Sequence, residues 1–405
     1  MYGITNLVAI FLVNKISDLP VLLDYWEQKA ISFSSFTIPN DNYYPPGAAI
    51  LLVPFLWAKP HYEFAVYFYF VAAAIVYYLI CNKIFSGKVS KIIALGAFTL
   101  NPYLLWLCNS GQDTVFELFL LLSFAALLIK ERFNISLLPL YFLCLVRPAY
   151  WCSFILIPPI YYIRNRHNLL AKIKLRVVVI PILVLLGTLF INQLSFGTPN
   201  LSTSSGTTAF FSHNKYYYLS MPKFDMDVFL SKGGNMDPAK VLANSNRFSS
   251  IKDIELRAAL VSIVENPKSF FLNTFQKVDS YFFAVQKTPQ LPGSYYLSED
   301  KKAIVIENER LSWVLIAGNA FYFIYRSLLL VSGIAALTLF VTYFRRKRVQ
   351  LTNHLGYFLL PYLTGAIPGI LYYTESRFKV VSELMLVPLI LAIFEGYKRT
   401  TQANS

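Results

Sequence analysis

The sequence predicts an all-α polytopic membrane protein that carries a small, mainly helical domain outside the membrane. Of its 405 residues, 56% are hydrophobic and 14% are charged, whereas a water-soluble domain carries about a quarter charged residues. The apolar residues form runs long enough to cross a hydrocarbon layer of about 30 Å. The basic residues gather in short clusters between those runs, which is the distribution that orients helices in a membrane.

Nine apolar segments are predicted to cross the membrane, and the shorter apolar segment 2–14 precedes them. Residues 46–58 are too few for a full crossing and are expected to form a juxtamembrane or re-entrant piece. The nine predicted spans are residues 64–81, 92–108, 114–129, 133–146, 148–163, 177–194, 327–344, 352–373 and 380–394.

The basic clusters predict the orientation of these spans, because short loops rich in Lys and Arg stay in the cytoplasm. Sixteen of the 36 basic residues fall in five such loops. They place the carboxyl terminus in the cytoplasm, which in a bacterial cell means the inner membrane. The loops at 109–113, 147 and 374–379 then face outward. The basic residues of the five loops are Lys83, Lys88, Lys91, Lys130, Arg132, Arg164, Arg166, Lys172, Lys174, Arg176, Arg345, Arg346, Lys347, Arg348, Lys398 and Arg399.

The long segment 195–326 differs from the rest of the chain and is predicted to form a domain outside the membrane. It holds 11 of the 22 acidic residues, balanced by 13 basic residues up to Arg310. Helical periodicity predicts helices over 252–265 and 267–283, the second with Pro267 at its first position. The chain thus divides into an amino-terminal membrane module (1–194) with an acidic first outer loop (15–45), the outer domain (195–326) and a carboxyl-terminal membrane module (327–405).

Several classes of function are disfavoured. The sequence contains no Gly-rich phosphate loop, nucleophile elbow or dinucleotide fingerprint. Its four cysteines lie in apolar stretches and its four histidines are far apart, so no ligand spacing indicates a metal site. A divalent metal among the outer carboxylates stays an option without a spacing to support it. Nucleic acid is not expected as a partner, because the net charge of +14 is spread over short loops between spans.

Ionisable side chains beside the apolar segments carry the functional information, because each costs about a few kcal/mol inside a membrane. Asp113 and Glu117 are four residues apart and share a helix face. Arg147 occupies the turn in LVRPAYW, while Arg326 and Glu383 lie near the outer ends of other spans. Two interpretations stay open: buried ion pairs that hold helices together, or a polar cavity in which Arg binds a lipid-linked phosphate.

The first outer loop adds carboxylates in the segment KISDLPVLLDYWEQKA. Asp18 and Asp24 are either solvated loop residues or groups available for proton transfer. Asp24 and Glu27 are three residues apart and share a face if this segment is helical.

Taken together, these segments resemble the GT-C superfamily of polytopic glycosyltransferases, which includes protein O-mannosyltransferases and lipid A aminoarabinose transferases. The resemblance lies in the order and spacing of motifs over most of the chain. An acidic loop with Tyr25, Trp26 and Ala30 comes first. It is followed in order by NYYPPGAAILLVPFL, NPYLLWLCNSGQDTVFELF, LVRPAYW, INQLSFGTPNLSTSSGTT, ENPKSFFLNTFQKV and YYTESRFKVVSELMLVPLILA.

The resemblance implies a GT-C-like transmembrane bundle and an inverting transferase active at the outer membrane face. Such an enzyme moves a sugar from a polyprenyl-phosphate carrier to a hydroxyl of a glycan, lipid or protein acceptor, and no cofactor is required. An aspartate early in the first outer loop serves as the base, which maps onto Asp24 or Asp18.

The resemblance also implies residues that bind the substrate. Tyr44 stands where some relatives carry a Lys that meets the lipid phosphate, so that contact passes to Arg147 or Arg377, assisted by Arg326. Asp113 and Glu117 are expected to bind sugar hydroxyls or to hold Arg147, and Glu383 lies at the same depth.

Two other classes of function stay open. A transporter or flippase of lipid-linked sugars predicts inverted halves and charges at the membrane midplane, and neither pattern is present in this sequence. A noncatalytic subunit of an envelope-glycan assembly complex predicts that loss of the acidic residues is harmless.

Overall fold

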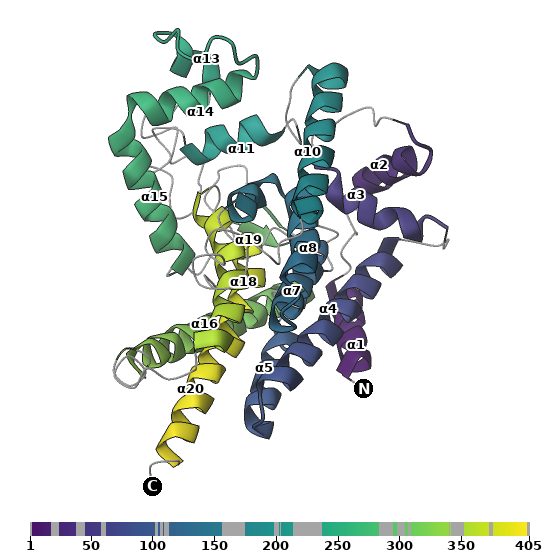
Figure 1. Cartoon of the computed structure of the whole chain (residues 1–405), viewed down its shortest axis with the longest axis vertical. Coiled ribbons are helices and arrows are strands. Elements are labelled where there is room, and N and C mark those ends of the chain that lie inside the picture. Colours follow the sequence, from purple (N-terminus) through teal and green to yellow (C-terminus); the bar gives the residue numbers. More distant parts are fainter. Residues whose placement is uncertain are drawn as a thin grey trace.

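Helices contain most of the described residues of the computed structural model (Figure 1). Within the described part of the chain, strands β1 (Tyr295–Leu297) and β2 (Ile304–Ile306) pair antiparallel, with Tyr296 opposite Val305. The predicted helical fold class is therefore confirmed, with one small hairpin added. The structure describes residues 2–17, 24–37, 45–57, 62–101, 104–105, 108, 113–155, 175–197, 202, 204–213, 237–282, 295–297, 304–306, 309–339, 341, 352–371 and 376–402.

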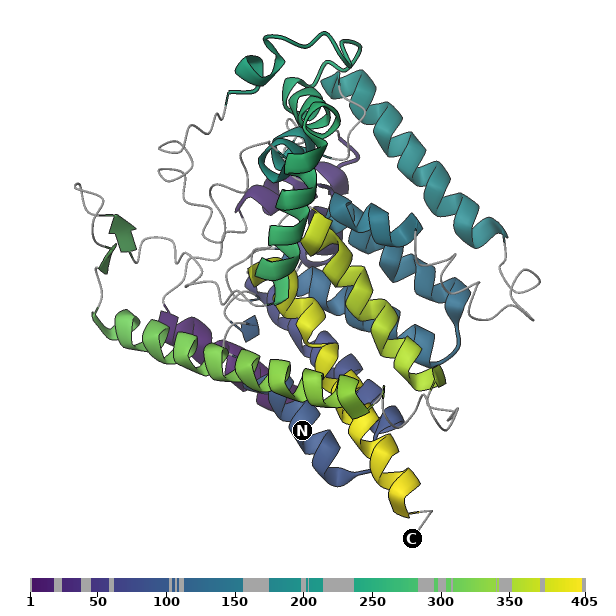
Figure 2. The same cartoon turned by 90° about the vertical axis from the view of Figure 1, so that its left-hand side faces the viewer.

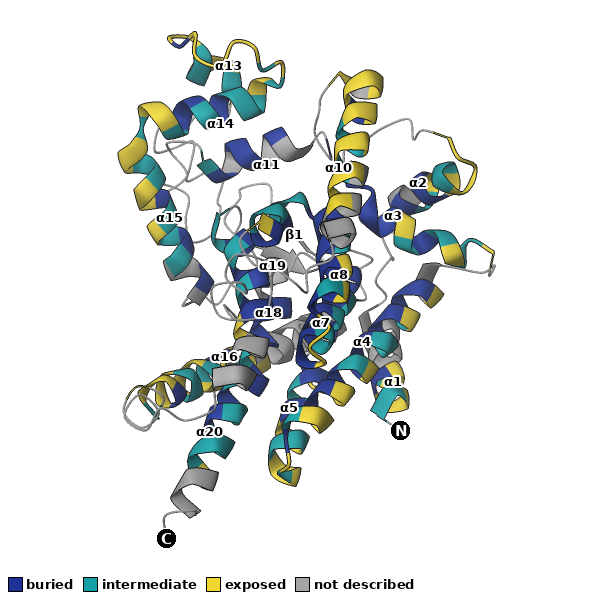
Figure 3. Ribbon diagram, viewed as in Figure 1, coloured by how far each residue is buried: buried dark blue, intermediate teal, exposed yellow. Residues whose placement is uncertain are grey.

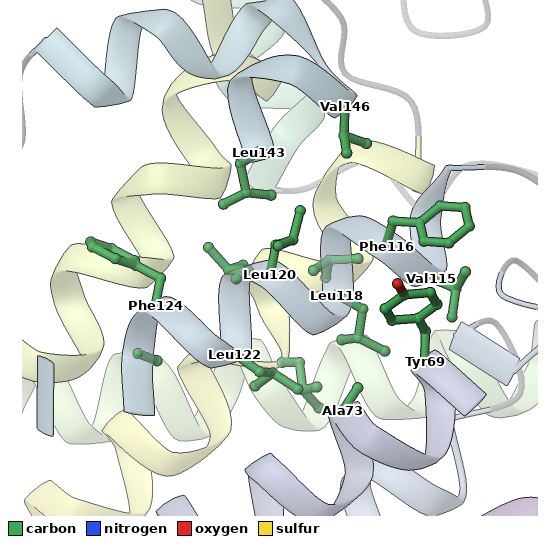
Figure 4. Close-up of a cluster of buried hydrophobic side chains, with 14 of the residues drawn as sticks. Tyr69, Ala73, Val115, Phe116, Leu118, Leu120, Leu122, Phe124, Leu143 and Val146 are labelled. Carbon is green, nitrogen blue, oxygen red and sulfur yellow. The ribbon is translucent and has the colours of Figure 1, made fainter. Parts of the chain in front are cut away.

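Helix α7 (Thr114–Ile129) lies at the centre of the bundle. It is apolar on all sides and buried along most of its length, as expected for a helix surrounded by other helices. Figure 4 shows its side chains meeting Tyr69 of α4 (Tyr62–Ile84) and Leu143 of α8 (Phe133–Val146). The other elements of the amino-terminal half of the chain are α1 (Tyr2–Ser17), α2 (Asp24–Ser34), α3 (Gly47–Leu52), the 3-10 helix η1 (Val53–Phe55), α5 (Lys88–Thr99), the 3-10 helix η2 (Pro148–Tyr150) and α10 (Leu175–Phe196).

The second half of the chain adds an outer layer and four further bundle helices. Three of its helices, α11, α14 and α15, pack beside one another in the outer layer (Figure 1), and α15 also packs on α18. Figure 2 shows the long helix α16 crossing α20 obliquely. The elements are α11 (Ser204–His213), α13 (Pro238–Leu242), α14 (Ile254–Glu265), α15 (Pro267–Phe282), α16 (Glu309–Leu339), α18 (Thr352–Leu371), α19 (Ser376–Glu383) and α20 (Leu386–Gln402).

The helix bounds agree with the predicted spans in the centre of the bundle and differ near the carboxyl terminus. The spans predicted over 114–129 and 133–146 coincide with α7 and α8. The predicted boundary after residue 326 falls inside α16, which is one continuous helix. The span predicted over 380–394 lies within the helical segment Val380–Lys398, in which a two-residue turn at Leu384 and Met385 separates α19 from α20.

Two of the described helical segments, Phe64–Ile84 and Val380–Lys398, are long and apolar enough to cross a membrane. Large apolar side chains are also exposed outside them, such as Leu194 on α10 and Val331 on α16, and Figure 3 shows α10 exposed over much of its length. Extended apolar surfaces mark contact with a membrane or a partner. The number of crossings stays a prediction. Five shorter apolar helices are Thr114–Ile129, Phe133–Val146, Leu185–Ser195, Phe323–Leu339 and Leu359–Leu371.

Candidate functional site

Arg147 lies at the point where α8 gives way to η2. Because Pro148 follows it, the helical conformation is disfavoured at Arg147, and its backbone is extended with φ −137° and ψ 111°. Its N–H still donates to the carbonyl of Leu143 at 2.8 Å. The Arg147 side chain therefore projects from a fixed backbone position at the end of α8.

Arg147 binds two carboxylates from the amino-terminal turn of α7. Its Nε and Nη2 donate to Asp113 Oδ2 and Oδ1 at 2.8 and 2.6 Å. Its Nη1 lies 2.6 Å from Glu117 Oε2. The positive end of the α7 dipole favours both carboxylates, and the two-pronged contact uses the planar geometry of the guanidinium. Both acids therefore form ion pairs with Arg147, and their predicted role in binding sugar hydroxyls stays a prediction.

Tyr150 completes this first cluster. Its hydroxyl donates to Glu117 Oε1, and both residues are buried. The side chain of Asp113 is 20% exposed, compared with 1% for Glu117. Asp113 is thus the carboxylate of the cluster that solvent or a ligand can reach. Arg147, Asp113 and Glu117 together carry a formal charge of −1, which disfavours an anionic ligand at this point.

A second cluster joins α15, α16 and α19. Arg326 forms a buried ion pair with Glu383, and its Nη2 donates to the Tyr281 carbonyl at 3.2 Å. The hydroxyls of Tyr281 and Ser382 are hydrogen-bonded to each other. Close packing of α18 on α19 supports this arrangement, because a Cβ on Gly365 would lie 2.5 Å from that of Ser382.

Tyr281 lies near charged residues of both clusters. Burial raises the pKa of the Tyr281 phenol; among nearby charges, Arg326 lowers this pKa and Glu117 raises it. Ser153, three residues after Tyr150, also donates to the Thr364 carbonyl of α18 at 2.9 Å. Five of the predicted charged residues therefore form two distinct ion-pair clusters: Arg147 with Asp113 and Glu117, and Arg326 with Glu383.

A cavity of about 520 Å³ opens beside the second cluster, between α16, α18 and α20. One part of its lining is polar, with Arg326, Glu383, Tyr281 and Tyr362. The remaining lining is Leu329, Leu330, Gly333, Ile334, Ala336, Leu337, Leu359, Leu386, Leu389, Ile390 and Ile393. The cavity is therefore mainly apolar, and the charged residues in its lining, Arg326 and Glu383, are paired with each other.

Helix α2, which belongs to the predicted first outer loop, is linked to α8 through a chain of helix contacts. α2 packs on α3 through buried residues that include Trp26 and Ala30, and α3 packs on the end of α8. Asp24 is the first residue of α2, but its side chain lies outside the described part of the structure. Asp18 and Tyr44 lie wholly outside the described residues, and Arg377 belongs to α19 without a described side chain.

Lys277 is a buried residue that the sequence-based analysis did not single out. Its Nζ donates to the carbonyls of Ser212 at 2.6 Å and Leu371 at 3.2 Å, near the carboxyl ends of α11 and α18, where a cation is favoured. Burial lowers the pKa of Lys277 to about 7. The pKa of His213 is lowered to about 3, by burial and then by Lys277.

Four further residues were not predicted from the sequence to take a place in these clusters: Tyr150, Tyr281, Ser382 and Tyr362. Tyr150 and Ser382 had a local signal, since Tyr150 lies three residues after Arg147 in LVRPAYW and Ser382 directly precedes Glu383. Tyr281 and Tyr362 come from distant segments that only the fold brings together. Among the described residues, no group of three or more His, Cys, Asp or Glu side chains is placed to hold a metal ion. Comparison with protein-family models, with curated proteins and with solved structures finds no match.

Proposed function

We propose that the protein is a multi-pass membrane glycosyltransferase that takes a sugar from a polyprenyl-phosphate carrier at the extracytoplasmic face. The observation that carries this proposal is the cavity between α16, α18 and α20, whose mainly apolar lining includes the paired residues Arg326 and Glu383. An amphiphile with one anionic head and an isoprenoid chain matches the apolar lining and the guanidinium of Arg326. The volume of about 520 Å³ lies in the usual range for ligand sites.

Membrane embedding is supported by the apolar helices and by the apolar side chains exposed on α10 and α16. Five short basic loops favour a cytoplasmic carboxyl terminus and an outer location for residues 195–326. In this arrangement both ion-pair clusters face the extracytoplasmic side.

Of the arginines predicted to meet the phosphate, Arg326 has the best support because it lines the cavity. Arg147 binds Asp113 and Glu117 and is not among the residues that line the cavity, so its proposed role is to position Asp113. The partly exposed Asp113 carboxylate is then available to sugar hydroxyls, with Glu117 held beneath it by Tyr150. Arg377 and Tyr44 stay proposed contacts of the donor.

The proposed reaction is a single displacement. Asp24 or Asp18 accepts the proton of the acceptor hydroxyl while that oxygen forms a bond to the anomeric carbon. The bond from this carbon to the phosphate oxygen breaks, its electron pair leaves with the lipid phosphate, and the configuration inverts. General-base assistance contributes about 10² to 10⁴ in rate, and Arg326 stabilises the charge on the departing phosphate.

The direct test is mass analysis of lipid-linked sugars in cells that lack the protein. A polyprenyl-phosphate sugar should accumulate, and wild-type protein should clear it, whereas Asp24→Asn and Arg326→Gln should not. Glu395→Gln is a matched control, because Glu395 lies on α20 away from the cavity lining and bonds the Gly87 N–H at 3.1 Å. Absence of accumulation, or full activity of both site variants, would rule the proposal out.

A noncatalytic subunit of a glycan assembly complex is the second candidate function. One observation favours it: Arg147, Asp113, Glu117 and Tyr150 bind one another as a clamp between α7 and α8 would. In that case Asp24→Asn and Arg326→Gln should support normal glycan assembly as long as the complex still forms.

A further inference from the structure

The polar end of the cavity is already occupied by a carboxylate of the protein itself. Glu383 and Arg326 both line the cavity and form an ion pair there. Arg326 is only 7% exposed and Glu383 only 3%. Any anion that enters the cavity to bind Arg326 must therefore compete with Glu383.

Carboxylates and phosphates bind a guanidinium through the same planar, two-pronged hydrogen bonds. Arg326 is also held from the other side, where its Nη2 donates to the Tyr281 carbonyl at 3.2 Å. Glu383 stands at the carboxyl end of α19, next to the turn of Leu384 and Met385 that leads into α20. An entering phosphate therefore has a fixed arginine to bind, and the displaced carboxylate lies beside a break between two helices.

A displaced Glu383 would have hydroxyl donors within the same end of the cavity. Tyr362 and Tyr281 line it, and the Tyr281 hydroxyl already bonds to Ser382, the residue before Glu383. These hydroxyls reduce the cost of separating a buried ion pair, which otherwise leaves an uncompensated charge.

We propose that Glu383 is an internal competitor for the anionic head group of the lipid donor and occupies Arg326 whenever no donor or product is bound. This inference rests on the proposed function. It assigns Glu383 a positioning role that acts through Arg326. Glu383 also promotes release of the lipid phosphate product from Arg326. This phosphate carries more negative charge than the sugar diester and would otherwise be held more tightly.

The test measures binding of radiolabelled farnesyl phosphate to the full-length protein in phosphatidylcholine nanodiscs, with farnesol as the uncharged probe. Glu383→Gln keeps the size of the side chain and removes its charge. We expect it to tighten farnesyl phosphate binding about tenfold, the effect of removing a competitor worth about 1.4 kcal/mol, with no change for farnesol. Glu395→Gln, on α20 but outside the cavity lining, should leave both affinities unchanged.

A double-variant cycle shows whether the effect passes through Arg326. Arg326→Gln should weaken farnesyl phosphate binding, and adding Glu383→Gln to it should give no gain. Glu383→Asp, which keeps the charge on a shorter side chain, should produce a smaller tightening in the same direction. The unfolding temperature of each variant in the same nanodiscs verifies that it is folded.

The possible failures are distinguishable. If wild-type protein and Glu383→Gln both bind farnesyl phosphate no better than farnesol, the phosphate site of the proposed function is wrong and this inference falls with it. If wild-type protein prefers farnesyl phosphate but folded Glu383→Gln binds it equally or more weakly, Glu383 supports the ligand and only the competitor role is overturned.

Discussion

Gly47 touches the backbone of Leu145: a Cβ built on Gly47 would lie 2.7 Å from the Leu145 carbonyl oxygen and would overlap the peptide bond to Val146. This contact joins the YPPG segment to the last turn of α8, directly before Arg147. Glycine is required there because any side chain would push the two backbones apart.

Gly47→Ala should therefore destabilise the protein by about 1 to 3 kcal/mol, the usual cost of overpacking, and should lower transfer activity by displacing Arg147. Unfolding in mixed detergent micelles and the transfer assay measure the two effects. Gly96→Ala is the control, since a Cβ at Gly96 would meet nothing within 4 Å. It should be neutral or stabilising by up to about 1 kcal/mol. Equal behaviour of the two variants would contradict the close-approach role of Gly47.

Removal of Arg147 should lower the free energy of unfolding because Asp113 and Glu117 would lose the cation that they share. Arg147→Met is expected to destabilise the protein by roughly 3 to 5 kcal/mol. Neutralising the acids as well, with Asp113→Asn and Glu117→Gln, should recover much of this stability without restoring transfer. Recovery of activity in the triple variant would show that the cluster only holds α7 and α8 together.

Lys277 should make stability depend on pH. Burial lowers its pKa from 10.5 to about 7, so between these values the unfolded chain binds the proton more tightly than the folded chain does. Stability then rises with pH over this window. We expect the unfolding temperature of wild-type protein, measured against that of Lys277→Met, to increase from pH 7 to pH 10. If the difference in unfolding temperature between wild-type protein and Lys277→Met is constant with pH, the lowered pKa of Lys277 is contradicted.

The outer location of residues 195–326 is tested by labelling single cysteines with a membrane-impermeant maleimide in a variant without the four native cysteines. Ser249 and Lys130 are both exposed, the first beside α14 and the second between α7 and α8. Ser249→Cys should be labelled on intact cells, and Lys130→Cys only after the membrane is opened. The reverse pattern would overturn the proposed orientation.

The sequence by itself determined the helical class and the bounds of α7 and α8, because continuous apolar runs between polar loops specify buried helices without information from elsewhere. It also showed that Asp113 and Glu117 share a helix face, and it left two roles open for them, the binding of sugar hydroxyls or the pairing with Arg147.

Only the tertiary structure decided which partner each charge takes and where the cavity lies. Arg326 and Glu383 are 57 residues apart, and Tyr281 reaches them from a third helix. Pairing at such separations depends on helix crossings, which many weak contacts set jointly and which no local pattern in the sequence encodes. The turn between α19 and α20 was not predicted either, because its residues Leu384 and Met385 are themselves apolar.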